Sequence, residues 1–117
     1  LCQNIKDLAK AGLQVSDAQY QAAISTQQRL RKEITEVFQD YDVLLCAPAT
    51  GEAPKGLGST GDPSFCALGS FLGIPAINIP AGKSKQGLPL GIQLMGDYKA
   101  DDHLLMASKF IEDSLLA

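Results

Sequence analysis

Three short segments are apolar almost throughout, and they constrain the fold more than any other feature of the sequence. They read DVLLCAP at 42–48, AINIPAG at 76–82 and LPLGIQLMG at 88–96. A strand with one face in water alternates apolar and polar residues, whereas a strand covered on both faces does not. Edge strands of a complete small domain would also show some alternation. The segments therefore predict strands that need cover on both faces and further strands beside them, as in part of a larger sheet.

The remaining segments predict four helices and one long loop. We expect helices at 2–11, 17–40, 63–72 and 101–115, a strand at 42–47, a loop at 48–62 and a hairpin at 76–95. The fold class is α/β, with about three strands and four helices in one partial domain covering 1–117. The chain begins at Leu1 rather than at a methionine, so we expect a longer parent polypeptide.

Short-range signals mark two helix starts and one irregular strand. Ser16 followed by Gln19 is a capping-box pattern, which satisfies two free amides at the start of helix 17–40. Asp62 can cap the helix at 63–72 in the same general way. Gly91, inside the last apolar segment, indicates a close backbone approach or a bulge.

Composition excludes several classes of partner. The 117 residues carry 10 Lys and Arg against 13 Asp and Glu, a net charge of −3, which leaves no basic surface for nucleic acid. No apolar run approaches the roughly 20 residues needed to cross a bilayer, so we expect no membrane partner. Three widely spaced cysteines fit neither a disulfide framework nor a zinc site. We therefore expect a reducing cytoplasm, no metal and no cofactor.

The segment KGLGSTGDPSF at 55–65 contains the G-x-G-x-x-G spacing of dinucleotide-binding turns. Such a turn directly follows a strand, opens a helix and is followed about 20 residues later by an acidic side chain. Here the apolar segment ends near Cys46, well before the first glycine, and no acid lies near Gly82, about 20 residues on. We therefore interpret the three glycines as part of a loop rather than a phosphate site.

The sequence contains no complete catalytic constellation. Ser84 lies between two lysines, but a polar turn cannot desolvate a lysine enough to make it a base. Cys46 and Cys66 have one possible base, His103, which sits beside two aspartates at a helix start and is expected to be exposed. Buried small cysteines and capping carboxylates account for these residues better than a Cys-His pair or a metal site.

Thr60, Asp62 and Phe65 are candidates for the wall of a binding pocket. They lie where a long loop meets the start of a helix, and the free amides of helix starts attract ligands. A catalytic role for Asp62 is a weaker interpretation than capping, because Asp62 directly precedes Pro63.

Three strings in a fixed order carry a resemblance to a known family. They are STGDPSF at 59–65, LGIPAINIPAG at 72–82 and GLPLGIQLMGDYKADDHLL at 87–105. Together they resemble the C-terminal segment of the amidase signature family, with its Gly-rich loop, its helix ending in L-G-x-P and its P-A-G and G-L-P-x-G-x-Q hairpin. The similarity covers about 41–111 and is closest to the general amidase and amidotransferase A-subunit branches.

The resemblance implies an activity but no catalytic residue in this chain. The family hydrolyses carboxamides or transfers their nitrogen through a serine nucleophile, a second serine in a cis peptide and a lysine. No segment here matches the one that holds those residues, so we expect the chain alone to be inactive. Thr60, Asp62 and Phe65 correspond to elements near the family's substrate cleft.

Two positions depart from the family pattern. Cys66 replaces an asparagine of many relatives, and Gly69 replaces a tryptophan or another large residue. The loss of bulk would enlarge or loosen the cleft wall. Cys66 joins the three residues above as a cleft-wall candidate.

Two functions from different classes follow. The first is the C-terminal part of an amide hydrolase that contributes sheet and cleft wall, with the N-terminal portion of the same enzyme as its partner and a small amide as substrate. The alternative is a stand-alone, non-catalytic binding or assembly module derived from an amidase. In either case, unpaired strands predict self-association of the isolated chain.

Overall fold

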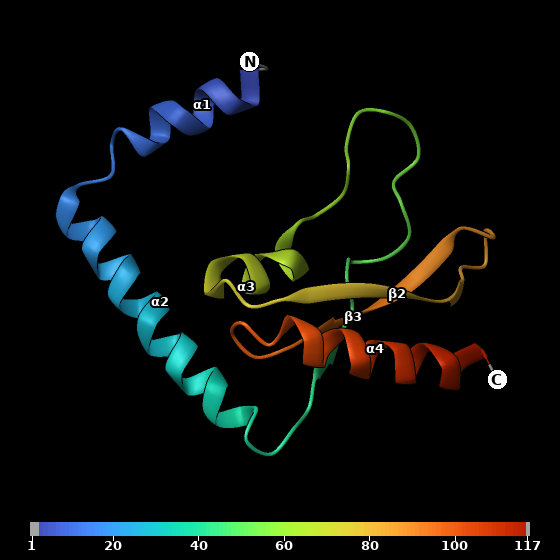
Figure 1. Ribbon diagram of the computed structural model, residues 1–117. Helices are drawn as coiled ribbons and strands as arrows, with labels where there is room; N and C mark the ends of the chain where they lie inside the picture. Colours follow the sequence, from blue (N-terminus) through green and yellow to red (C-terminus); the bar gives the residue numbers. More distant parts are fainter. Residues whose placement is uncertain (1–2, 117) are drawn as a thin grey trace.

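The chain folds into a small antiparallel sheet with helices on both faces (Figure 1). A computed structural model describes residues 3–116. In chain order the elements are α1 (Gln3–Gly12), α2 (Asp17–Val37), β1 (Leu44–Cys46), α3 (Ser64–Leu72), β2 (Ala76–Lys83), β3 (Pro89–Met95) and α4 (Asp101–Leu116). Within this described part, four helices and three strands confirm the predicted α/β class. Cys2, at the start of the first predicted helix, lies outside the described residues.

Strand β3 is the centre of the sheet. The strand order is β1-β3-β2, and both neighbours run antiparallel to β3. The β2–β3 turn is closed by Ser84, whose Oγ accepts two backbone N–H groups of the turn (both 3.2 Å). The register shifts between Pro80 and Gly82, so β2 bulges beside Gly91. Among the described residues, β1 and β2 are therefore the two edges of the sheet.

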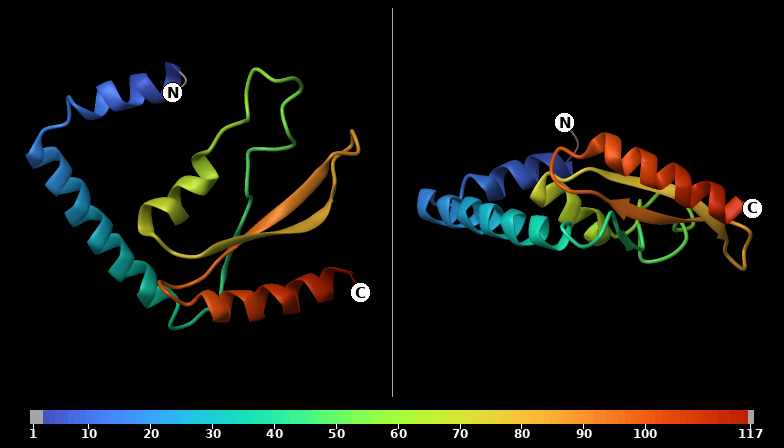
Figure 2. Two further views of the ribbon diagram at one scale, coloured as in Figure 1. Left: turned by 45° about the horizontal axis from the view of Figure 1, so that its top comes forward. Right: turned by 60° about the horizontal axis from the view of Figure 1, so that its bottom comes forward.

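The two faces of the sheet bury separate apolar clusters. The cluster beneath α4 consists of Ile79, Leu94 and Leu104, with Val43, Ile77, Ile92 and Ile111 around them. The cluster on the opposite face consists of Leu72, Ile74 and Met95, with Leu30, Ile34, Leu44 and Cys46 around them. Figure 2 shows α4 on one side of the strands and α3 on the other. Helices on both faces explain why the central strand lacks a polar face.

Polar contacts dock the C-terminal half of α2 onto the rest of the fold. Arg31 Nε donates to the carbonyl oxygen of Leu72 at the end of α3 (2.7 Å). The same guanidinium lies 4.3 Å from the centre of the Tyr98 ring. Thr35 Oγ1 donates to Asp97 Oδ1 (2.8 Å) in the segment between β3 and α4. Helix α2 thus joins α3 to the loop after β3.

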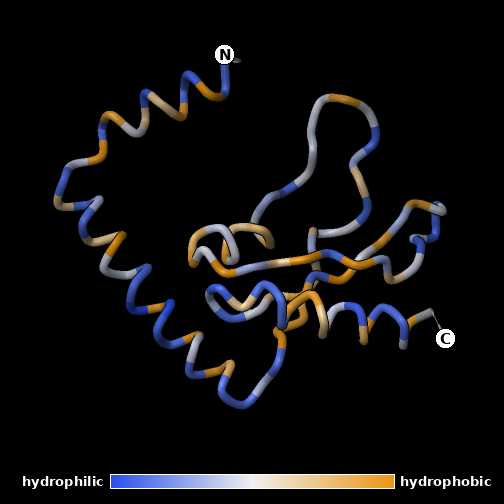
Figure 3. The backbone as a smooth tube through the Cα atoms, viewed as in Figure 1, coloured by the Kyte–Doolittle hydropathy of each residue, from blue (hydrophilic) through white to orange (hydrophobic). Residues whose placement is uncertain are grey.

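Helix α1 and the first half of α2 extend away from the sheet, with apolar residues along them (Figure 3). No residue of α1 is buried, and Leu8 and Leu13 are 70% and 84% exposed. Uncovered apolar side chains in a row indicate a contact surface. Within residues 3–116, no helix is long and apolar enough to cross a bilayer.

Several element ends differ from the predicted ones. Helix α2 ends at Val37 rather than at residue 40. The backbone N–H groups of Gln39 and Asp40 donate to carbonyl oxygens three residues earlier instead of four, which ends the α-helical pattern. Strand β1 is shorter than the predicted 42–47, and Pro48 beyond it has no N–H to extend the ladder. Helix α3 begins at Ser64, one residue after the predicted start, and α1 and α4 each end one residue after the predicted end.

Replacing Arg31 with alanine is expected to lower the free energy of unfolding by about 1–3 kcal/mol, because a charged hydrogen bond and a cation–π contact are lost. Arg29→Ala is the matched control, since the Arg29–Glu33 ion pair is exposed and should be worth less than about 0.5 kcal/mol. Urea unfolding measures both variants. Equal losses would contradict the role given to Arg31.

Candidate functional site

A cleft opens on the face of the sheet that carries α3, beside the loop after β1. Its volume is about 520 Å³. It is lined by Ala47, Pro48, Ala49, Gly51, Cys66, Asn78, Pro89, Leu90, Gly91 and Gln93. None of these residues is charged, and only Cys66, Asn78 and Gln93 carry a polar group in the side chain. Because an ion would find no counter-charge here, the lining suits a neutral group.

Gln93 is the most firmly held polar side chain of the cleft. It is paired with Cys46 on β1 and with Asn78 on β2, so the three side chains form one row across the sheet. Gln93 is only 7% exposed. Its Nε2 donates to Cys46 Sγ (3.3 Å) and to the carbonyl oxygen of Phe65 (3.2 Å). One buried amide therefore ties β3 to β1 and to the first turn of α3.

Asn78 lies over the backbone of Gly91 on the neighbouring strand. A Cβ at Gly91 would lie 2.3 Å from Asn78 Oδ1 and 2.9 Å from its Cγ, closer than real Cβ contacts. The close approach predicted at Gly91 is confirmed. Only glycine at this position leaves room for Asn78 where it now lies.

The four predicted cleft-wall residues are placed differently from one another. Cys66 lines the cleft, and its Sγ donates to the Pro48 carbonyl oxygen (3.6 Å). Phe65 contributes its backbone carbonyl to the Gln93 network. Thr60 and Asp62 are exposed in the segment that leads into α3 and do not line this cleft.

Asp62 acts as a hydrogen-bond acceptor at the start of α3. Its Oδ1 accepts the backbone N–H of Ser64 (2.9 Å). Hydrogen bonds from the Ser64 side chain and backbone lower the pKa of the Asp62 carboxyl. The carboxylate is therefore ionised at neutral pH and has no proton to donate. The predicted capping by Asp62 is not formed in the usual way, because the N-cap residue of α3 is Pro63 and no side chain caps this helix.

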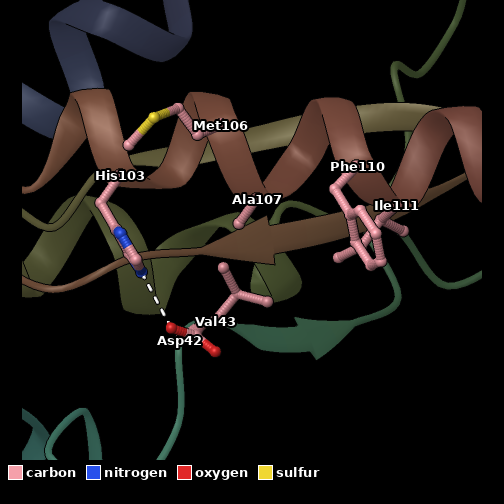
Figure 4. Close-up of a pocket in the computed structure, with 7 residues that line it drawn as sticks. All are labelled: Asp42, Val43, His103, Met106, Ala107, Phe110 and Ile111. Atoms are coloured by element: carbon pink, nitrogen blue, oxygen red, sulfur yellow. Dashed lines mark hydrogen bonds and ion pairs between the residues drawn. The ribbon is translucent and has the colours of Figure 1, made fainter.

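A second cavity, of about 440 Å³, lies between α4 and the start of β1 (Figure 4). It is lined by Asp42, Val43, His103, Met106, Ala107, Phe110 and Ile111. His103 Nε2 lies 3.1 Å from Asp42 Oδ1, and both side chains are exposed. Residues 3–116 contain no group of three side chains that could hold a metal ion.

The structure does not form the Cys-His pair. His103 belongs to α4, on the opposite face of the sheet from the row that contains Cys46. The expected burial of the cysteines is only partly right, because Cys46 is half-buried and Cys66 is exposed. Cys66 is exposed because it lies where α3 opens onto the cleft.

Sequence patterns miss Asn78 and Gln93 as cleft residues. Each is the single polar residue in its apolar segment. A polar side chain in a strand covered on both faces needs a hydrogen-bond partner or a ligand. A lone polar residue in an apolar segment is therefore a sequence signal that could have indicated these two residues. The strand register that places the two side chains together is not visible in the sequence.

The fold and the cleft define an α/β protein whose sheet, within residues 3–116, has β1 and β2 as its edges. The family model described as Amidase matches residues 3–105. This chain belongs to the amidase family, and the resemblance of its motifs to the amidase signature family is confirmed.

Relatives show how much of such a protein the chain represents. The glutamyl-tRNA(Gln) amidotransferase A-subunit of Alkaliphilus metalliredigens is 36% identical over 107 residues, covering 85% of this chain and 22% of the relative. Its counterpart from Rubrobacter xylanophilus is 39% identical over 106 residues, covering 84% and 22%. The chain thus spans about 22% of the length of these curated relatives.

Two solved structures share the fold. A crystal structure of an amidase superposes with a TM-score of 0.84 at 24% identity, covering 97% of this chain and 29% of that chain. A bacterial aryl acylamidase of the amidase signature family superposes with a TM-score of 0.66 at 25% identity, covering 90% and 24%. The arrangement of helices and strands therefore recurs within larger proteins.

Replacing Gly91 with alanine is expected to cost about 1 kcal/mol of unfolding free energy, because the new Cβ displaces Asn78. Asn78→Ala removes the obstacle, so the double variant should regain most of that loss. Gly58→Ala is the control, since a Cβ at Gly58 meets nothing within 4 Å. Urea unfolding of the four variants gives the coupling energy. Purely additive losses would show that Asn78 and Gly91 do not interact.

Proposed function

We propose that this chain is the C-terminal part of an amide hydrolase and that it supplies sheet and substrate-cleft wall, but no catalytic serine or lysine. The observation that carries the proposal is the uncharged cleft. It offers hydrogen-bonding side chains, but among the residues that line it no nucleophile has a base beside it. Such a wall can position a neutral carboxamide for a nucleophile that another part of the protein provides.

The proposed substrate is a small amide, and the proposed partner is the N-terminal portion of the same enzyme. Of the four proposed cleft-wall residues, Cys66 lines the cleft that would hold this substrate, and Phe65 contributes its backbone carbonyl to the Gln93 network. Thr60 and Asp62 lie in the segment before α3, outside the lining. The short coverage of the relatives and the uncovered surface of α1 support a larger enzyme around this chain. Carbon–nitrogen bond hydrolysis of this kind needs no cofactor, and the cytoplasm is the proposed location.

A stand-alone binding or assembly module is the second candidate. It is favoured by the fact that both apolar clusters and the cleft are formed within this one chain. The codons upstream of Leu1 discriminate between the two functions. A start codon directly before Leu1 would favour the module, and a continuous reading frame with a serine- and glycine-rich segment would favour the enzyme.

We also propose that the isolated chain self-associates through its sheet edges. In the described part of the chain, β1 and β2 each pair on one side only, and Leu45 on β1 is 61% exposed. Unpaired edges are templates for pairing with a second copy. Light scattering at high micromolar concentration should give the mass of a dimer, and a clean monomer would count against this proposal.

The 117-residue chain is expected to release ammonia from acetamide or benzamide no faster than buffer does, because no paired nucleophile and base line the cleft. The Ser84→Ala, Cys66→Ala double variant is the control for activity from these two side chains. Turnover that follows the polypeptide through purification and survives both substitutions would refute the claim that the chain is inactive alone.

A further inference from the structure

The Gln93 side chain has one fixed orientation in the cleft wall. Its Nε2 lies 3.2 Å from the Phe65 carbonyl oxygen and 3.3 Å from Cys46 Sγ. With the amide reversed, Gln93 Oε1 would face the Phe65 oxygen, and two acceptors with no hydrogen between them repel. The two hydrogen bonds therefore use Nε2, and Oε1 has no hydrogen-bond partner within residues 3–116.

That oxygen is available to a ligand. Within residues 3–116, Nε2 donates both hydrogen bonds of the Gln93 side chain. Oε1 makes none, and it does not belong to the unpaired side-chain atoms that are fully buried, so a ligand can reach it. Gln93 is 7% exposed and still lines the cleft. A nearly buried, rigid acceptor at the wall of a cleft needs a donor from whatever fills the space.

The surroundings of Gln93 select among donors. No charged residue lines the cleft, so a carboxylate would meet the Gln93 lone pairs with no cation to compensate. A neutral carboxamide can donate its N–H to Oε1, and Asn78, the neighbour of Gln93 on β2, offers both a donor and an acceptor. An ester of the same shape has no N–H to give.

We propose that Gln93 is a specificity-determining residue of this cleft: its Oε1 accepts the N–H of a neutral carboxamide and thereby favours the amide over the corresponding carboxylate. The inference rests on the proposed function and deepens it, because it identifies the carboxamide N–H as the substrate group that the cleft wall recognises. It also gives the acid product of hydrolysis a weaker hold than the amide substrate.

The test compares three probes that share one ring: benzamide, benzoate and N,N-dimethylbenzamide. Their binding to the ¹⁵N-labelled 117-residue chain is followed by NMR, including the side-chain NH₂ signals of Asn78 and Gln93. Benzamide should bind roughly tenfold more tightly than either other probe, since one hydrogen bond donated to a buried acceptor is worth about that factor. The shifts should map to Asn78, Gln93 and Cys66.

Gln93→Met removes the acceptor and keeps both the length and the net charge of the side chain. The preference for benzamide should fall below about threefold in this variant, because Oε1, the acceptor assigned to the amide N–H, is gone. Gln86→Met, in the exposed β2–β3 turn outside the cleft lining, is the matched control and should keep the full preference. A preference that survives Gln93→Met in a folded chain overturns the assignment.

The dimethylated probe keeps the proposal falsifiable if Gln93→Met does not fold. It lacks an N–H, so equal binding of benzamide and N,N-dimethylbenzamide by the unmodified chain overturns the assignment without any variant. Equal binding of benzamide and benzoate does the same. The Gln93 assignment is tested by binding constants, whereas the proposed function is tested by ammonia release. Failure of the assignment is therefore distinguishable from failure of the proposed function.

Discussion

Strand β3 carries the contacts on which the rest of the structure depends. Its Ile92 and Leu94 side chains pack beneath α4, while Met95 packs on the opposite face against α3. Between them, Gln93 donates to a side chain of β1 and to the backbone at the start of α3. One strand therefore forms both apolar clusters and fixes the wall of the cleft, because alternate residues point to opposite faces.

This arrangement leaves the cleft rigid on one side and the sheet open at two edges. The rigid side comes from the buried Gln93 amide and from Gly91, whose missing Cβ leaves room for the Asn78 side chain. The open edges come from a sheet in which, among the described residues, only β3 has two neighbours.

How far the sequence predicts this structure depends on the range of the interaction that decides each feature. The start of α2 is local, and both hydrogen bonds of the Ser16–Gln19 capping box are present as predicted. The close approach at Gly91 is also predictable, because a glycine inside an apolar strand indicates a bulge or a nearby group that a side chain would displace. The length of β1 is not, because it depends on how far β3 can pair with it before Pro48.

The cleft shows the same division. Cys66, at a position that departs from the family pattern, lines the cleft, whereas Thr60 and Asp62, expected from the family motif, lie outside its lining. Gln93 and Asn78 become neighbours only through the antiparallel register of β2 and β3, a non-local pairing that no sequence spacing encodes. The positions of Asn78 and Gln93 in the cleft can therefore be recognised only from the structure.

Hydrogen exchange of the monomeric chain at low micromolar concentration tests most directly whether this sheet is open at both edges. Amides of β3 should exchange at least about tenfold more slowly than those of β1 and of β2 away from the hairpin turn, because β3 has ladder partners on both sides. If β1 and β2 were as well protected as β3 in a monomer, both edges would already be covered. The chain would then be a finished sheet rather than part of a larger one.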